Sequence, residues 1–264
     1  MAVIRTEFYA MSLGRQVRFT AVLANDVPSF VTMDNPHFSR PAKTIYLLHG
    51  HGGWDSDWLY NSPLTQLAGK YNVNFILPSG ENWFYLDGEA SDRKYCQYVG
   101  KELVDYTRKL FGLSDKKEDT FVGGLSMGGF GALHTGLAFP ETFSKIMALS
   151  SAFIVHEVKN MEEGSGNPIA NYDYYRMVFG DPKKLEFSEN NPEHQIRLLQ
   201  EAGKEVPPIY MAIGTEDFLY QENQILRKFL EEHKVDFVYS EGPGVHDFDF
   251  WNQHLPLAIE WFLS

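Results

Sequence analysis

Three residues that lie far apart in the sequence have the types and surroundings that nucleophilic catalysis requires: Ser126, Asp217 and His246. Ser126 lies in a G-x-S-x-G pattern, residues 124–128 (GLSMG), which follows an apolar run and precedes a helical one. Small residues on both sides of a serine allow a sharp strand-to-helix turn, which exposes the hydroxyl at a helix N-terminus. The pattern therefore predicts a nucleophilic serine. The structural alternative is a glycine-rich turn with an N-capping serine.

A serine hydroxyl is a weak nucleophile at neutral pH, so it needs a histidine to accept its proton and a carboxylate to orient that histidine. Asp217 follows the buried apolar run 209–214, and His246 lies in the loop between the run 235–240 and the last helical segment. Serine, then acid, then histidine is one of the chain orders known for such triads. Glu216 is the alternative acid, and an N-cap is the alternative role for Asp217.

The oxygen of an attacked carbonyl becomes negative and needs preorganised hydrogen-bond donors. We expect the backbone N–H groups of Met127, directly after the serine, and of His51, in the loop after the run 44–48, to form this oxyanion hole, with Gly52 as the next choice. His49 and His51 could alternatively be metal ligands, but no third ligand lies near them in the sequence. We therefore predict no metal and no cofactor.

The elements that must position these residues alternate along the chain. The predicted strands are residues 3–9, 16–23, 44–48, 73–77, 120–122, 146–149, 209–213 and 237–239, and the predicted helices are 58–71, 93–111, 127–139, 221–233 and 255–263. This alternation predicts one α/β domain over residues 1–264, with a mostly parallel, doubly wound sheet and helices on both faces. In such sheets functional groups lie at the carboxyl ends of the strands.

Residues 151–207, before the strand that carries the acid, break this alternation because they are polar and contain Gly-Ser-Gly-Asn-Pro and Gly-Asp-Pro. We interpret them as an insertion of short helices that forms either a small lid over the site or a plain surface excursion.

Aromatic side chains cluster after three of the predicted strand ends. Such rings can bind an acyl chain, an aryl ring or a sugar face, although core packing is the better explanation for any one of them. We expect at least two of the rings after these strand ends to line a substrate pocket. These rings are Trp54, Trp58, Trp83, Phe84, Tyr85, Phe248, Phe250 and Trp251. If the insertion is a lid, further rings could line the pocket, namely Phe153, Tyr172, Tyr174 and Tyr175.

The composition excludes several classes of protein. The net charge of −12 argues against a nucleic-acid binder. The single cysteine, Cys96, excludes a disulfide framework and a cysteine-based zinc site. No segment has the roughly 20 consecutive apolar residues of a membrane span, and the N-terminus lacks the apolar core of a signal peptide. A cytoplasmic protein without nucleic-acid or membrane partners is therefore expected.

The chain resembles the esterase D-like branch of the α/β-hydrolases, and within it the tributyrin esterases of low-GC Gram-positive bacteria. The resemblance covers nearly the whole chain. It rests on residues 8–15 (FYAMSLGR), 47–53 (LLHGHGG) with Trp58, 83–87 (WFYLD), 124–132 (GLSMGGFGA), 214–218 (GTEDF) and 242–246 (GPGVH). The sequence departs from the tributyrin type at 83–87 and at His51, and both differences touch the acyl or alcohol pocket.

The resemblance implies the α/β-hydrolase fold and a serine carboxylesterase for short acyl chains, with Ser126, Asp217 and His246 as its triad. Its substrate is a small-molecule ester, and a homo-oligomer is left open because related proteins are often oligomeric. Feruloyl or acetylxylan esterases and S-formylglutathione hydrolases are the alternatives within the family. Outside it, the alternative is a non-catalytic binding protein that keeps the fold, although no triad member is missing.

Overall fold

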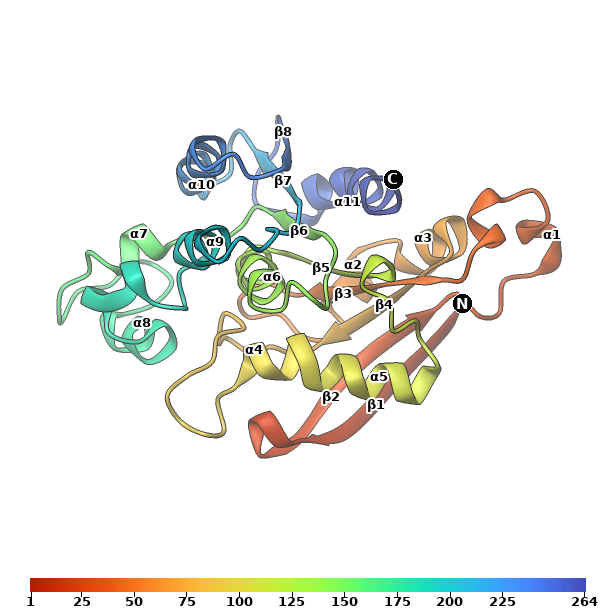
Figure 1. Cartoon of the computed structure of the whole chain (residues 1–264), viewed down its shortest axis with the longest axis horizontal. Helices are drawn as coiled ribbons and strands as arrows, with labels where there is room; N and C mark the ends of the chain where they lie inside the picture. Colours follow the sequence, from red (N-terminus) through yellow and green to blue (C-terminus); the bar gives the residue numbers. More distant parts are fainter.

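The computed structural model describes residues 1–264 as a single eight-stranded sheet with helices on both faces (Figure 1). The strands are β1 (Ala2–Ala10), β2 (Arg15–Leu23), β3 (Lys43–Leu48), β4 (Val73–Pro78), β5 (Thr120–Leu125), β6 (Ile146–Leu149), β7 (Ile209–Gly214) and β8 (Phe237–Gly242). The α-helices are α1 (Ser29–Thr32), α2 (Asp57–Asn61), α3 (Leu64–Tyr71), α4 (Tyr95–Gln97), α5 (Leu103–Phe111), α6 (Met127–Ala138), α7 (Val155–Val158), α8 (Tyr172–Phe179), α9 (Pro192–Glu201), α10 (Tyr220–Glu232) and α11 (Phe248–Leu263).

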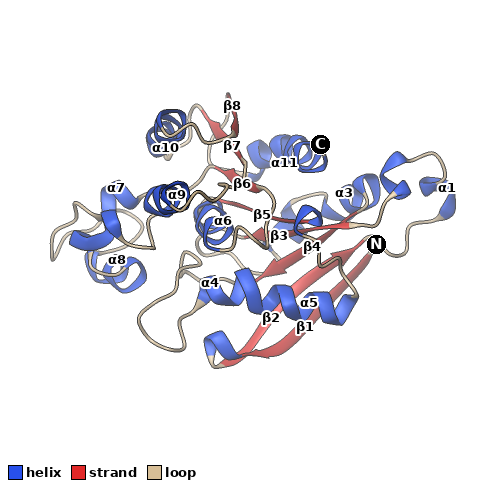
Figure 2. Ribbon diagram, in the orientation of Figure 1, coloured by secondary structure: helices blue, strands red, loops and turns tan.

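Strand order across the sheet is β1-β2-β4-β3-β5-β6-β7-β8. The pairs β1–β2 and β2–β4 are antiparallel, and all the others are parallel. Figure 2 draws the strands of this sheet in red and the helices around it in blue. The predicted mostly parallel α/β sheet is thus confirmed. β3 and β5 are neighbours at its centre, so the loops after their carboxyl ends, residues 49–53 and the turn at Ser126, lie side by side.

Burial explains why the central strands read as continuous apolar runs. Every residue of β4, β5 and β7 is buried, because helices cover both faces of the sheet. One apolar core joins the sheet to α5, α6 and α10, and a second joins its other face to α3 and α11. The expected helices on both faces are therefore confirmed.

Three predicted helices have different limits in the structure. The segment 58–71 forms two helices, α2 and α3, because Pro63 interrupts it. The segment 93–111 begins at Tyr95 and passes through a π-helical stretch, Tyr98–Glu102, between α4 and α5. The last helix begins at Phe248 rather than 255, because the side chain of Asp247 caps it by accepting a hydrogen bond from Phe250 N–H (3.0 Å).

The insertion between β6 and β7 contains α7, α8, the 3₁₀-helix Pro182–Phe187 and α9, with no strand of the sheet. In Figure 1 it lies on the left in green and cyan, and α9 packs against α6. Among all the helices, none is both long and apolar enough to cross a membrane.

Candidate active site

Ser126 occupies the sharp turn between β5 and α6, with an unfavourable positive φ of 54° and a ψ of −122°. Two glycines make this turn sterically feasible. A Cβ at Gly124 would lie 2.3 Å from the carbonyl oxygen of Gly128, and a Cβ at Gly128 would lie 2.3 Å from that of Leu48. The Ser126 N–H donates to the carbonyl of Leu149 at 2.9 Å, which anchors the turn to β6. A strained serine of this kind, at the start of a helix, is typical of an exposed nucleophile.

Asp217 and His246 meet at the carboxyl ends of β7 and β8. The Nδ1 of His246 hydrogen-bonds to Asp217 Oδ2 at 2.8 Å, and Oδ1 lies 3.1 Å from the same nitrogen. The Asp217 side chain is fully buried and that of His246 is 16% exposed. Asp217 Oδ1 also accepts a hydrogen bond from Leu219 N–H at 2.9 Å. Glu216, the alternative acid, instead accepts a hydrogen bond from Gly244 N–H at 2.6 Å.

The imidazole of His246 is held between two aromatic side chains. Phe218 packs against it at a centroid distance of 4.6 Å, and Trp251 meets it edge-on at 5.0 Å. Trp251 is fixed in turn, because its Nε1–H donates to Ser150 Oγ at 2.9 Å. These contacts limit the orientations that the ring can adopt, which matters because a general base must point one particular nitrogen at its substrate.

Two backbone N–H groups of residues 49–53, called here the oxyanion loop, already have acceptors within the molecule. Gly52 N–H donates to Asn82 Oδ1 at 2.7 Å, and Gly53 N–H donates to the carbonyl of Gly50 at 3.0 Å. Gly52 is therefore engaged elsewhere, and His51 N–H is the better candidate donor. Met127 begins α6, where N–H groups have no intrahelical acceptor.

His49 is buried, and both of its ring nitrogens have partners. Nδ1 lies 2.7 Å from the carbonyl oxygen of Gly50, and Nε2 accepts a hydrogen bond from Gly80 N–H at 2.9 Å. Burial lowers the pKa of His49 to about 4, so the ring is neutral at pH 7, with its proton on Nδ1. Its nitrogens are thus unavailable for a metal ion together with His51.

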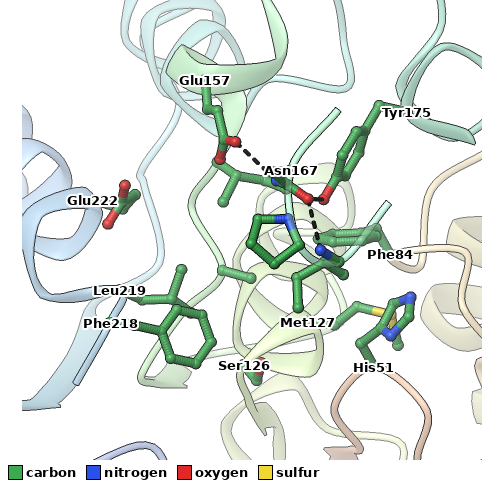
Figure 3. A pocket seen from close by; sticks show the side chains of 14 residues that line it. His51, Phe84, Ser126, Met127, Glu157, Asn167, Tyr175, Phe218, Leu219 and Glu222 are labelled. Carbon is green, nitrogen blue, oxygen red and sulfur yellow. Dashed lines mark hydrogen bonds between the residues drawn. The ribbon is translucent and has the colours of Figure 1, made fainter. Parts of the chain in front are cut away.

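A cavity of about 460 Å³ opens above Ser126 (Figure 3). Half of its fourteen lining residues belong to the insertion, so this segment walls the site. Its lining is His51, Phe84, Ser126, Met127, Ala152, Ile154, Glu157, Asn167, Pro168, Ile169, Tyr175, Phe218, Leu219 and Glu222.

Hydrogen bonds stabilise the far side of this cavity. Asn167 Nδ2 donates to Glu157 Oε1 at 2.8 Å, and Tyr175 O–H donates to Asn167 Oδ1 at 3.1 Å, both drawn in Figure 3. Glu157 and Glu222 bring two carboxylates to a wall that is otherwise mostly apolar, and no lysine or arginine is among the lining residues.

Of the aromatic residues expected after the strand ends, only Phe84 lines the cavity, so the expectation of at least two was wrong. Trp58 and Tyr85 are buried beneath the oxyanion loop. Trp58 Nε1–H donates to the carbonyl of Leu48 at 2.9 Å, and Tyr85 O–H donates to that of His49 at 3.1 Å. A buried indole or phenol needs such a partner, which draws these rings under the loop rather than into the cavity.

The other expected rings lie elsewhere. Trp83 stacks on Tyr95, and Arg93 covers its outer face. Trp54 is 46% exposed and lies under the guanidinium of Arg18. Phe248, Phe250 and Trp251 belong to the first turn of α11, where Phe248 packs on Trp58 and on Trp251, and the other two are buried.

Several lining residues were not expected from the sequence. Phe218 follows the acid directly, a position that could have indicated it. Tyr175 was expected only if the insertion covered the site, and Tyr174 instead borders an adjoining cavity of about 540 Å³. Other lining residues have no local sequence pattern that would predict their place in the cavity, because their spacing does not show which face of a short helix or loop meets the site. These are Ile154, Glu157, Asn167 and Glu222.

Comparisons with known proteins agree with this architecture. The family model described as "Putative esterase" matches residues 31–262. An acetyl esterase of Caldicellulosiruptor saccharolyticus is 42% identical over 261 residues, which are 99% of this chain and 98% of that protein. The substrate-bound fluorophosphonate-binding serine hydrolase F (FphF) of Staphylococcus aureus superposes with a TM-score of 0.85 at 26% identity, over 100% of this chain and 98% of that chain. The S-formylglutathione hydrolase FrmB of the same organism gives 0.83 at 26% identity, over 100% and 99%.

Proposed function

Because this chain belongs to the Esterase family and is a carboxylic ester hydrolase with the α/β-hydrolase fold, we propose that it cleaves short-chain acyl esters with Ser126, His246 and Asp217 as its catalytic triad. The observation that carries the proposal is the 2.8 Å contact between His246 Nδ1 and Asp217 Oδ2 beside a cavity that Ser126 lines. Acetyl to butyryl groups are the proposed acyl range.

In the proposed mechanism, Ser126 Oγ attacks the ester carbonyl while His246 Nε2 accepts the hydroxyl proton. Asp217 holds the Nδ1–H tautomer and stabilises the imidazolium that forms. The N–H groups of Met127 and His51 donate to the oxyanion. His246 then protonates the departing alcohol, leaving an acyl group on Ser126. A water molecule that gives a proton to His246 then attacks the acyl carbon; the bond to Ser126 Oγ breaks, the carboxylic acid leaves, and His246 returns the proton to Ser126.

The acyl-length proposal is supported by the far side of the cavity. An alkyl chain that extended beyond the apolar walls of Phe84, Met127 and Ile154 would approach the carboxylate of Glu157. Burying alkyl groups against a carboxylate removes water from a charged group without replacing its hydrogen bonds, which is unfavourable. Long chains are therefore expected to bind less well than acetyl or butyryl groups.

Hydrolysis of p-nitrophenyl acetate and butyrate by wild type and Ser126→Ala tests the proposal. The variant should lose roughly 10³-fold or more of kcat/KM, whereas Ser39→Ala, whose exposed hydroxyl donates to the carbonyl of Pro36 far from the site, should keep wild-type activity. Activity of Ser126→Ala near that of wild type would refute the triad. Faster hydrolysis of p-nitrophenyl palmitate than of the butyrate would refute the acyl range.

Kinetics with methyl ferulate, acetylated xylan and S-formylglutathione distinguish the alternatives within the family. Each substrate is measured with wild type and with Ser126→Ala. Whichever of these exceeds the simple short-chain esters in kcat/KM would replace them as the preferred class. The two carboxylates of the cavity argue against the last compound, because glutathione itself carries carboxylates.

A further inference from the structure

The loop after β4, residues 80–85, is called here the supporting loop, and its backbone is unusually strained. Glu81, Phe84 and Tyr85 all have positive φ angles, of 48°, 51° and 57°. Such angles are unfavourable for residues with a Cβ and persist only where the surroundings hold them. The carboxylate of Glu81 is held by Arg15 and by Tyr95, whose O–H donates to Oε2 at 2.8 Å. The molecule thus fixes this loop in one conformation.

The supporting loop makes three hydrogen bonds to the oxyanion loop. Gly80 N–H donates to His49 Nε2 at 2.9 Å, and Tyr85 O–H donates to the carbonyl of His49 at 3.1 Å. Asn82 Oδ1 accepts the third, from Gly52 N–H, at 2.7 Å. The first two contacts fix the buried start of the oxyanion loop, whereas Asn82 is the residue of the supporting loop that holds the peptide following His51.

We propose that Asn82 is a positioning residue for the oxyanion hole, an inference that rests on the proposed function. By holding the peptide between His51 and Gly52, its side chain limits rotation of the adjoining peptide, which carries His51 N–H. Gly52 has no side chain and a φ of 75°, so within its own loop only the hydrogen bond from Gly53 N–H to the carbonyl of Gly50 (3.0 Å) restrains it. Asn82 also occupies Gly52 N–H, which leaves His51 as the donor of the two that the sequence predicts.

Asn82 also connects the oxyanion loop to the insertion. Its backbone carbonyl accepts a hydrogen bond from Tyr174 O–H, in α8, at 2.6 Å. The ring of Tyr174 stands edge-on to the imidazole of His51 at a centroid distance of 5.9 Å. The segment that walls the acyl cavity therefore contacts the same two residues, His51 and Asn82, that set the donor geometry. Tyr174 is thus the route by which the insertion influences the oxyanion hole.

Kinetics of Asn82→Ala with p-nitrophenyl acetate test this role, together with inhibition by trifluoroacetone. In the inhibited enzyme Ser126 Oγ bonds to the ketone carbon, the serine proton passes to His246, and the ketone oxygen carries the negative charge in the oxyanion hole. We expect kcat and the affinity for trifluoroacetone each to fall about tenfold, with KM changed less than twofold, because a misplaced donor weakens only the charged adduct. Titration with a fluorophosphonate gives the concentration of active sites. Because kcat is calculated from that concentration, misfolded protein does not lower it.

The control is Asn61→Ala, an exposed asparagine whose amide donates to the carbonyl of Asp57, which should leave both quantities unchanged. Tyr174→Phe should lower kcat about threefold, and adding it to Asn82→Ala should cost little more than Asn82→Ala alone, because both act through one hydrogen-bonded chain. Unchanged kcat and inhibitor affinity in Asn82→Ala would overturn the inference. Because Ser126→Ala is measured in parallel, its inactivity would show that the triad proposal still stands.

Discussion

The carboxylate of Asp217 accepts a 2.8 Å hydrogen bond from Nδ1 of His246, although 29 residues separate the two in the chain. Two neighbouring parallel strands, β7 and β8, bring them together, because each residue follows the carboxyl end of its strand. The side chain of Asp217 is fully buried, and the side-chain group that hydrogen-bonds to it is the imidazole of His246. In the proposed triad the two residues have different tasks: Asp217 orients the imidazole, and His246 carries protons.

Asp217→Asn should lower kcat by roughly 10³- to 10⁴-fold while leaving the fold intact, because an amide no longer selects the Nδ1–H tautomer. Steady-state kinetics and circular dichroism measure the two effects. Glu216→Gln is the matched control: Glu216 contacts Gly244 N–H rather than His246, so kcat should change less than tenfold. The opposite ranking of the two variants would make Glu216 the acid.

Gly128→Ala should prevent formation of the turn at Ser126, because the new methyl group would lie 2.3 Å from the carbonyl oxygen of Leu48. We expect loss of about 3 kcal/mol or more of the free energy of unfolding, or insoluble protein. Gly112→Ala is the comparison: its φ of 64° is left-handed, unlike that of Gly128, but no atom lies within 4 Å of the added carbon, so the cost should be about 1 kcal/mol of backbone strain. Urea unfolding measures both, and equal losses would contradict the steric argument.

Burial lowers the pKa of both His49 and His134 to about 4. The unfolded chain, in which a histidine titrates near pH 6.5, therefore binds more protons between pH 6.5 and 4. The free energy of unfolding should be highest above pH 6.5 and fall by up to about 3 kcal/mol per histidine as the pH approaches 4. Urea unfolding at a series of pH values measures this slope. In His134→Gln the slope should flatten, and a slope equal to that of wild type would contradict the assignment.

Glu222→Gln should relax the selection against negatively charged esters. Glu222 and Glu157 line a cavity without lysine or arginine, so a carboxylate on the acyl group meets two like charges. We expect kcat/KM for p-nitrophenyl hydrogen glutarate, relative to p-nitrophenyl butyrate, to rise about fivefold. Glu232→Gln, at the exposed end of the same helix, α10, should not change this ratio. An unchanged ratio in Glu222→Gln would mean that the acyl group does not approach this residue.

The sequence predicted the elements around Ser126, Asp217 and His246 because their signals are local. Ser126 and Asp217 each follow a short, continuously buried strand, whereas His246 follows the partly exposed edge strand β8. Glycines mark the crowded turn at Ser126. The wall of the cavity has no such signal. Whether Glu157 or Ile169 faces the site depends on how an irregular insertion packs, and the periodicity of the sequence does not encode this.

The aromatic side chains show a second limit of prediction. Trp58 and Tyr85 were expected in the pocket because they follow the right strands, but each donates a hydrogen bond to the backbone of residues 48–49. A ring that supports a loop and a ring that lines a cavity look alike in sequence, since both are large and near a strand end. Asn82 was missed for the converse reason, because a polar residue in a turn is unremarkable until its partner is known.

Half of the cavity's lining comes from one continuous segment, whereas the proposed nucleophile, acid and base all sit on strand ends outside it. Under the proposed function, the choice of ester is therefore largely separated in the chain from the chemistry performed on it. We expect that exchanging residues 151–207 for the corresponding segment of a relative would alter substrate preference, provided that its core residues, such as Val158, Phe179 and Ile196, are kept. The new segment would also have to supply the Tyr174 hydroxyl for Asn82 and the Ala152 N–H that donates to the carbonyl of Ser126 at 2.9 Å.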